Sequence, residues 1–272
     1  SVLEQFKSLI EFELDKKLIK FNNIVVTSTP RRIVLLLEGL VDYAEDKTIV
    51  RKGPKANSAF LDGSPTNAAL GFANSLGIDV GELEIKNTEK GDFVFGKKIE
   101  KGQSTKISLS SIVPKVMKSL QGPRFMKWGA GNTKFSRPIR WITSIYNDDI
   151  LDFVFDECDP NIQISNKSKS HRLINEVLEV KNPDNFFEIL KQNRVLVERH
   201  ERKEKIESLI NQASKLLNLK PDLSKGLLDE LTDLVEWPEL IIGEFSDEFL
   251  DLPVEVLSTV MKSHQRYVPL LL

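Results

Sequence analysis

The chain has 272 residues, of which 40% are hydrophobic and 29% charged, and its formal net charge is −2. This length and composition fit one large or two modest globular domains and exclude a disordered chain, and the near-neutral charge argues against a nonspecific nucleic-acid binder. No apolar run approaches the roughly 20 residues that span a bilayer, and the first residues lack the layout of a signal peptide, so we expect a cytoplasmic protein with no membrane partner.

The spacing of apolar residues predicts helices and strands interspersed along the first part of the chain. The helices are expected over 2–18, 65–76 and 108–120. The strands are expected over 23–29, 33–40, 92–99, 141–146 and 150–155. Ser64 is expected to cap the second helix, which buries Ala68 and Ala69 and ends at Gly77, and the last two strands are expected to form a hairpin.

The second part of the chain begins where the sequence turns polar, and we place a lobe boundary between residues 157 and 158. Helices are expected over 183–192, 199–219, 228–235 and from Pro253 to Met261, with short strands over 195–197 and 240–243. The irregular strand spacing favours an α+β fold over a doubly wound sheet. We therefore expect two mixed α/β lobes, 1–157 with a basic surface and 158–272 with an acidic C-terminal part.

Charge is distributed unevenly between these lobes. From Lys101 to Asn147 there are nine basic residues and no acid, whereas from Pro221 to Met261 eleven acids accompany a single base, Lys225. Such polarity indicates a molecule with one face suited to phosphate. A solvated basic surface beside an unrelated acidic one is the alternative, and charge alone leaves both interpretations open.

Basic and aromatic residues alternate between positions 124 and 141. The basic members are Arg124, Lys127, Arg137 and Arg140, and the aromatic members are Phe125, Trp128, Phe135 and Trp141. Guanidinium groups bind phosphate in a bidentate fork, so we expect the four basic residues to contact RNA. We expect the tryptophans and Phe135 to serve the core instead. Arg31 and Arg32 form a weaker basic pair, for which RNA contact and a satisfied strand end are both open.

Few residues could support catalysis or metal binding. Neither a phosphate-binding glycine loop nor a GxSxG or HExxH motif occurs, and the one cysteine, Cys158, is interpreted as a small buried residue. Ser170 and His171 are adjacent, and neighbours in a strand seldom point at each other, which disfavours a hydrolase. We therefore predict no catalytic residue, no metal ligand and no cofactor on this chain.

Two further clusters have both a functional and a structural interpretation. Glu236 and Trp237 could act in a site, but a helix-capping Glu and a packed Trp are favoured. The run at 264–267 could read RNA, dock a partner or complement a helix dipole. Its members are His264, Gln265, Arg266 and Tyr267.

Several motifs together resemble the β subunit of the bacterial two-subunit glycyl-tRNA synthetase, in that family's order and over nearly the whole chain. They are TPRR at Thr29–Arg32, Gly53-Pro54, PTNAALGF at Pro65–Phe72, Lys90-Gly91, MKWG at Met126–Gly129, RPIRW at Arg137–Trp141, SHR at Ser170–Arg172, VEWP at Val235–Pro238, FLDLPVEVL at Phe249–Leu257, and Met261 with HQRY at His264–Tyr267. Lys127 stands where the family usually has Arg, which keeps the charge but loses the guanidinium fork.

The resemblance implies a chain without an aminoacylation site. In the family, glycine activation with ATP and Mg²⁺ sits on a separate catalytic α subunit, the β subunit carries most of the recognition of tRNA-Gly, and two α and two β chains form a heterotetramer. It also implies likeness to the α+β editing-type domain of the phenylalanyl-tRNA synthetase β chain. From the SHR motif we add His171 and Arg172 to the expected RNA contacts.

Three hypotheses follow for the function. The first is a non-catalytic region that supports tRNA binding and docking of the α subunit. The second is a protein-interaction scaffold without direct RNA contact, in which the acidic region 221–261 binds a partner. The third, an editing hydrolase, is disfavoured because glycine is the smallest amino acid and larger ones can be excluded sterically.

Overall fold

The computed structural model describes residues 1–129, 131–155 and 162–271. The chain forms two compact units: unit 1 contains Ser1–Glu13, Phe21–Gly39 and Leu109–Leu272, and unit 2 contains Leu14–Lys20 and Leu40–Ser108. Helices alternate with small sheets in both, so the predicted α+β class is confirmed. The predicted boundary at 157/158 and Cys158 lie outside the described residues. No helix of the described ranges is long and apolar enough to cross a membrane.

Unit 1 begins with residues 2–13 of helix α1 and with a hairpin. Helix α1 (Val2–Lys16) buries Ile10 and Leu14 at the i, i+4 spacing that predicted it. Strands β1 (Asn23–Thr29) and β2 (Arg32–Glu38) pair antiparallel from Asn23 opposite Glu38 to Thr29 opposite Arg32. Pro30 and Arg31 therefore form a two-residue turn at the strand junction, where the amide donor that proline lacks is not needed for the ladder.

Short two-residue strands fill the middle of unit 1, after helix α4 (Thr105–Ser119). The pairs are β8 (Met126–Lys127) with β9 (Lys134–Phe135), β10 (Ile142–Thr143) with β13 (Ile164–Ser165), and β11 (Ile145–Tyr146) with β12 (Asp149–Ile150); the three-residue strands β14 (Lys167–Lys169) and β15 (Val177–Glu179) pair likewise. The expected hairpin of 141–146 with 150–155 forms only at its tip. Ser144 interrupts it, because its amide donates to the carbonyl of Ser165 instead.

The C-terminal part of unit 1 is mainly helical. It contains η2 (Pro183–Asn185), α5 (Phe186–Gln192), α6 (Arg199–Leu217), β16 (Lys220–Pro221), α7 (Lys225–Leu234), η3 (Asp247–Asp251), α8 (Val254–Val260), the π-helical turn η4 (Met261–Gln265) and β17 (Leu270–Leu271). No strand forms at 195–197 or at 240–243, so these two predictions are wrong. Val195 and Val197 are buried, but the amide of Leu196 bonds a single carbonyl, that of Glu236, and forms no ladder.

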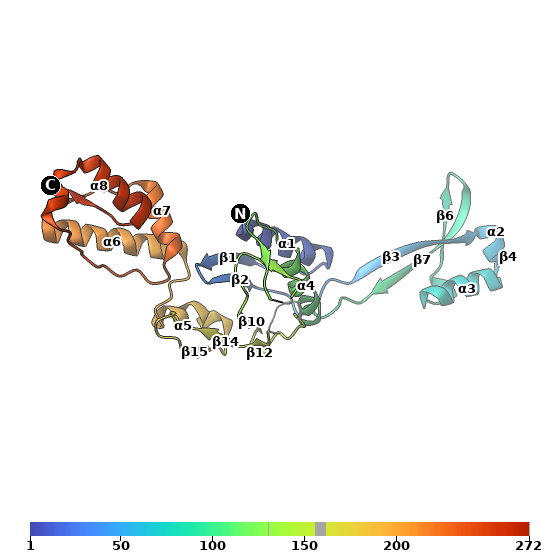
Figure 1. The fold of residues 1–272 in the computed structure, drawn as a ribbon. Coiled ribbons are helices and arrows are strands. Elements are labelled where there is room, and N and C mark those ends of the chain that lie inside the picture. Colours follow the sequence, from blue (N-terminus) through green and yellow to red (C-terminus); the bar gives the residue numbers. More distant parts are fainter. Residues whose placement is uncertain (130, 156–161, 272) are drawn as a thin grey trace. The chain divides into compact units, whose positions relative to one another are not determined.

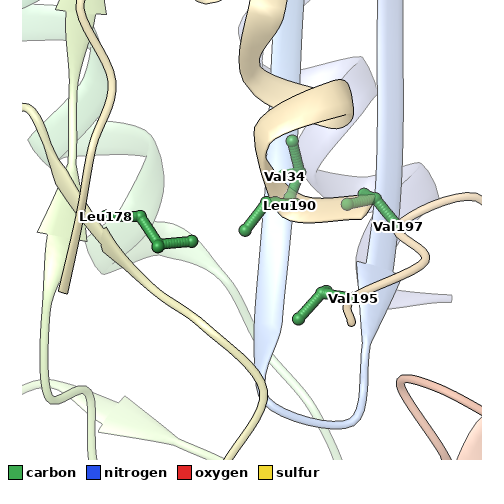
Figure 2. Packing of buried hydrophobic residues seen from close by; sticks show 5 residues of the cluster. All are labelled: Val34, Leu178, Leu190, Val195 and Val197. Carbon is green, nitrogen blue, oxygen red and sulfur yellow. The ribbon is translucent and has the colours of Figure 1, made fainter. Parts of the chain in front are cut away.

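One core of unit 1 joins the hairpin to α5. Figure 2 shows its buried members, in which the side chain of Val34 from β2 lies beside Leu190 of α5. The other labelled members are Leu178, Val195 and Val197. Burial of these side chains fixes the hairpin against a segment more than 140 positions later, since apolar area removed from water is the main stabilising term.

Unit 2 is a three-stranded antiparallel sheet with short helices (Figure 1). The strand order is β3–β7–β6, with bounds Lys47–Lys55, Gly91–Glu100 and Glu84–Thr88. The helices are α2 (Ala56–Ala59), α3 (Asn67–Leu76) and η1 (Val80–Glu82), and β4 (Phe60–Leu61) pairs with β5 (Ser64–Pro65). Strands β3 and β6 were not expected, because both are rich in polar and charged residues and β3 contains a proline.

The start of α3 also differs from the expectation. Thr66, not Ser64, is its N-cap, and its hydroxyl accepts a hydrogen bond from the amide of Ala68. Ser64 is instead held in the β4–β5 pair, where it lies opposite Leu61. Ala68 is exposed, whereas Ala69 is buried, and Gly77 ends the helix at φ +69° as expected.

Candidate nucleic-acid interface

The segment from 124 to 141 begins as a small antiparallel ribbon. Strands β8 and β9 pair Met126 with Phe135, and the rings of Phe125 and Phe135 lie 5.0 Å apart. The indole Nε1 of Trp128 donates to the carbonyl of Phe135 at 3.0 Å. These aromatic side chains are half-buried and contact one another, so they brace the segment from which the basic residues project.

The four basic side chains of this segment are exposed. Lys127 Nζ donates to Oδ1 of Asn132 at 3.1 Å. Within the described ranges, Arg124, Arg137 and Arg140 have no ion-pair partner. Three guanidinium forks are therefore available to an anion from solution.

The rest of the acid-free stretch is less basic than its sequence indicates. Lys115 of α4 places Nζ 2.7 Å from both carboxylate oxygens of Glu13. Lys101 pairs with Asp46 at 2.9 Å. Acids from elsewhere in the chain thus offset part of the run, and the unpaired charge is concentrated at 124–140.

Arg31 and Arg32 lie around one buried carboxylate. Glu236 is 4% exposed; its Oε1 accepts from Thr29 Oγ1 at 2.6 Å and lies 3.4 Å from Arg32 Nη1, and its Oε2 lies 3.4 Å from Arg31 Nη1. The guanidinium carbons of the two arginines lie 5.5 and 5.8 Å from the ring centre of Trp141. Burial, opposed by Glu236 and reinforced by Arg31, lowers the pKa of Arg32 to about 10.

This cluster joins four of the motifs found in the sequence. Arg31 also donates to the carbonyl of Ser170 at 3.3 Å, and Arg32 to that of Lys169 at 3.1 Å. TPRR, RPIRW, SHR and VEWP therefore meet at one place. Glu236 caps no helix, contrary to the favoured interpretation. Both guanidiniums contact groups within the protein, but Nε and Nη1 of Arg32 are buried without a hydrogen-bond partner, so the strand end is only partly satisfied. RNA contact by Arg31 and Arg32 stays a prediction.

Ser170 and His171 do not form a side-chain pair. The Ser170 hydroxyl accepts from the amide of Glu176 at 2.7 Å and donates to the carbonyl of His171 at 3.3 Å, while His171 Nδ1 accepts from the amide of Leu173. Ser170 is fully buried, whereas Arg172 is exposed. The arrangement orders a turn and supplies no nucleophile oriented by a base.

The run at 264–267 covers the end of the π-helical turn η4 and the two residues after it. Arg266 takes a left-handed conformation at φ +58°, and its Nε lies 2.6 Å from Oε1 of Glu230 on α7. His264, Gln265 and Tyr267 are exposed, with Tyr267 at 59%. Arg266 thus forms an ion pair within the protein, and the other three side chains are exposed and open to a partner.

One structurally important residue escaped the sequence interpretation. Arg202 of α6 is 1% exposed and donates four hydrogen bonds, all to main-chain carbonyls. The acceptors are Leu196 and Val197 at 2.8 Å, Ser28 at 3.0 Å and Thr232 at 3.2 Å. The spacing could have indicated its burial. Arg202 lies four residues before Ile206 and eight before Ile210, and residues four apart share one face of a helix, here the buried face of α6.

Within the described residues no cluster of three His, Cys, Asp or Glu side chains could hold a metal ion. The region thus presents exposed guanidiniums in the segment of the β8–β9 ribbon and, from other residues, a buried ionic cluster around Glu236.

Comparisons with known proteins agree with the motifs. The family model described as glycyl-tRNA synthetase beta subunit matches residues 1–271. A glycine–tRNA ligase beta subunit of Trichodesmium erythraeum is 40% identical over 268 residues, covering 98% of this chain and 37% of the relative. The corresponding proteins of Acaryochloris marina and Clostridioides difficile are 38% and 36% identical, over 99% and 100% of this chain and 38% and 39% of their own lengths. The chain thus spans about two fifths of the curated relatives it matches, and it belongs to the glycyl-tRNA synthetase beta subunit family.

Proposed function

We propose that this chain is a non-catalytic region of a glycine–tRNA ligase, which supports binding of tRNA-Gly and assembly with the catalytic α subunit. The family match over residues 1–271 supports this role. The α subunit would use ATP and Mg²⁺ to activate glycine, in a cytoplasmic assembly of two α and two β chains. This region would then act by positioning the tRNA.

The observation that carries the RNA-binding part is the set of exposed guanidiniums at Arg124, Arg137 and Arg140. A guanidinium binds two phosphate oxygens through parallel hydrogen bonds, and no carboxylate of the described residues competes for these three. Pro138 fixes the backbone between two of them. Lys127 and Arg172, both exposed, would add charge without the same geometric constraint.

The test is charge reversal at Arg137 and Arg140. Fluorescence anisotropy with a labelled tRNA-Gly transcript measures the affinity of the wild-type chain and of the double variant Arg137→Glu, Arg140→Glu over a range of salt concentrations. The variant is expected to bind more weakly, with a salt slope shallower by about 2, because each lost phosphate contact removes close to one released counterion.

A matched control reverses two exposed lysines, Lys215 of α6 and Lys220 of β16 (Lys215→Glu and Lys220→Glu), which changes the net charge equally at a distance in sequence from the ribbon. Equal losses for both double variants would mean that only net charge matters. An unchanged affinity of the arginine variant would remove the RNA role of this segment.

A second candidate function is a protein-binding scaffold, and exposed apolar residues favour it. Ile241 is 91% exposed, and Leu250 is 62% exposed within the acidic region. Contiguous exposed apolar residues mark interaction sites on soluble proteins. In this case the arginine variant would keep its tRNA affinity in the assembly, and Ile241→Asp would weaken co-purification with the α subunit.

A further inference from the structure

The sheet of unit 2 has two different faces. Val94 of β7 is fully buried against Ala59 of α2 and Ala69 of α3, so one face is covered by helices. Successive residues of a strand point to opposite faces, which places Phe93 and Phe95 on the other face. Figure 1 shows α2 and α3 gathered at the end of the β3–β7 ribbon.

That other face is open to solvent within unit 2. Val50 and Ile99, which share it with Phe95 by strand alternation and register, are 50% and 61% exposed. Phe93 and Phe95 are half-buried and take no part in the core on the covered side. Both aromatic rings therefore lie outside the helix-covered core, on the face that no helix of unit 2 covers.

Lysines surround both rings. Across the ladder Lys52 lies opposite Phe95, and Lys55 and Lys86 lie on either side of Phe93. The Nζ of Lys52 is 3.4 Å from the ring centre of Phe93, and that of Lys86 is 5.7 Å from the ring centre of Phe95.

The charge of this face is positive. A further lysine, Lys97, shares the face with these three lysines, and among the described strand residues there Glu84 is the one acid. Glu84 is already neutralised by Lys97 at 2.5 Å and Lys86 at 3.3 Å. The face therefore presents aromatic rings within a net cationic surround.

This combination suits unpaired nucleotides. A base can stack on a phenyl ring because every base has a π-face, and lysines on flexible stems can bind the phosphates between bases. An exposed cation–π contact is weaker than base stacking. A base can therefore replace the lysine ammonium above the ring, and the released ammonium can then bind a phosphate of the RNA. A duplex hides its base faces and does not fit.

We propose that the open face of the β3–β7–β6 sheet binds single-stranded RNA, with bases stacked on Phe93 and Phe95 and phosphates held by Lys52, Lys55 and Lys86. The inference rests on the proposed function only for the source of the RNA, an unpaired segment of tRNA. It assigns this binding to unit 2, which is separate from the arginines of the β8–β9 segment.

The test measures the anisotropy of a fluorescein-labelled oligouridylate with the full 272-residue chain. The double variant Phe93→Leu, Phe95→Leu keeps apolar volume but removes the rings, and about a tenfold or greater loss of affinity is expected. The double variant Lys52→Gln, Lys86→Gln should bind more weakly, with a shallower salt slope. Lys98→Gln is the matched control, since Lys98 is exposed on β7 but points to the opposite face.

A second measurement does not require that the sheet folds with leucine at positions 93 and 95. Phe95→Trp should retain binding, and its added tryptophan emission should be quenched by oligouridylate. Absence of oligouridylate binding, equal loss in the Lys98→Gln control, or quench-free binding by Phe95→Trp would overturn the inference. Lost co-purification with the α subunit at unchanged oligouridylate affinity would overturn it in favour of a protein partner.

The two proposals can fail independently. A chain that binds oligouridylate through Phe93 and Phe95 but does not bind tRNA-Gly supports the sheet-face site and refutes the proposed function. The opposite result is that tRNA-Gly affinity depends on Arg137 and Arg140, while the phenylalanine variants leave oligouridylate affinity unchanged. That result supports the proposed function and refutes the sheet-face site.

Discussion

Thr29 donates a 2.6 Å hydrogen bond to the carboxylate of Glu236, a residue 207 positions further along the chain. Through this bond the end of strand β1 is tied to the segment that follows α7. Arg31 and Arg32 contact the same carboxylate from the turn and from β2. The cluster thus holds the hairpin to the C-terminal part of unit 1 by buried charge as well as by the apolar core.

Replacement of Glu236 by Gln is expected to destabilise unit 1 strongly. The amide is nearly isosteric but leaves Arg32, whose side chain is 5% exposed, without its counter-charge. Removal of one partner of a buried ion pair costs about 3–5 kcal/mol, because the remaining charge stays desolvated. Urea unfolding followed by circular dichroism measures the change.

The control for this variant is Glu239→Gln, three positions later. Glu239 pairs with Arg194, and both side chains are more than half exposed, so the pair is screened by water and its loss should barely move the unfolding midpoint. Similar midpoints for the two variants would contradict a stabilising role of the buried cluster.

Arg202→Met is expected to cost about 2–4 kcal/mol, since the thioether fills much of the volume but leaves the carbonyls of Leu196 and Thr232 without the Arg202 donor, whereas Val197 keeps its hydrogen bond from the Thr27 hydroxyl. Arg202→Lys should recover only part of the loss, because a single ammonium cannot reach acceptors spread around a planar fork. Arg199→Met, on the exposed side of the same helix, is the control. Chemical denaturation of the three variants should separate Arg202 clearly from Arg199.

A pH-dependent contribution is expected from Asp222. Hydrogen bonds from Lys262 and Ser258 hold its pKa below the ordinary value of 3.8. A carboxyl with a lowered folded-state pKa stabilises the fold above its unfolded-state pKa, and this stabilisation is lost as pH falls through the folded-state value. The difference in unfolding midpoint between wild type and Asp222→Asn should therefore be full at neutral pH and shrink below pH 3.8. Asp247→Asn, at an exposed aspartate of η3, is the control because it removes the same charge.

The sequence predicted well wherever apolar residues repeat at a regular spacing. Helix α1, strands β1 and β2, and helix α6 were expected within a few residues of their observed bounds. It failed where charge and turn chemistry compete with periodicity. Strand β3 is mostly lysine, arginine and glycine, and its pairing with β7 depends on contacts distant in sequence that no local pattern encodes.

The candidate site was predicted in composition but not in arrangement. Exposed Arg137 and Arg140 follow from an acid-free stretch, because unpaired guanidiniums seek water or an anion. The partnership of Arg31 and Arg32 with Glu236 could not be predicted, since nothing near residue 236 indicates that it meets the turn at residue 30. Phe93 and Phe95 were missed because strand alternation shows which face they share but not whether that face is covered.

Two glycines of unit 2 are expected to respond in opposite directions to the same change. In Gly53→Ala the new Cβ would lie 2.5 Å from Cε1 of Phe72, so the ring must shift and overpacking should cost about 1–3 kcal/mol. In Gly71→Ala nothing lies within 4 Å of the new methyl group, and alanine inside the exposed part of α3 should stabilise by about 0.5–1 kcal/mol through helix propensity. Thermal unfolding should show a lower melting temperature for Gly53→Ala and a higher one for Gly71→Ala. A lower melting temperature for Gly71→Ala would show that other atoms crowd the added methyl group.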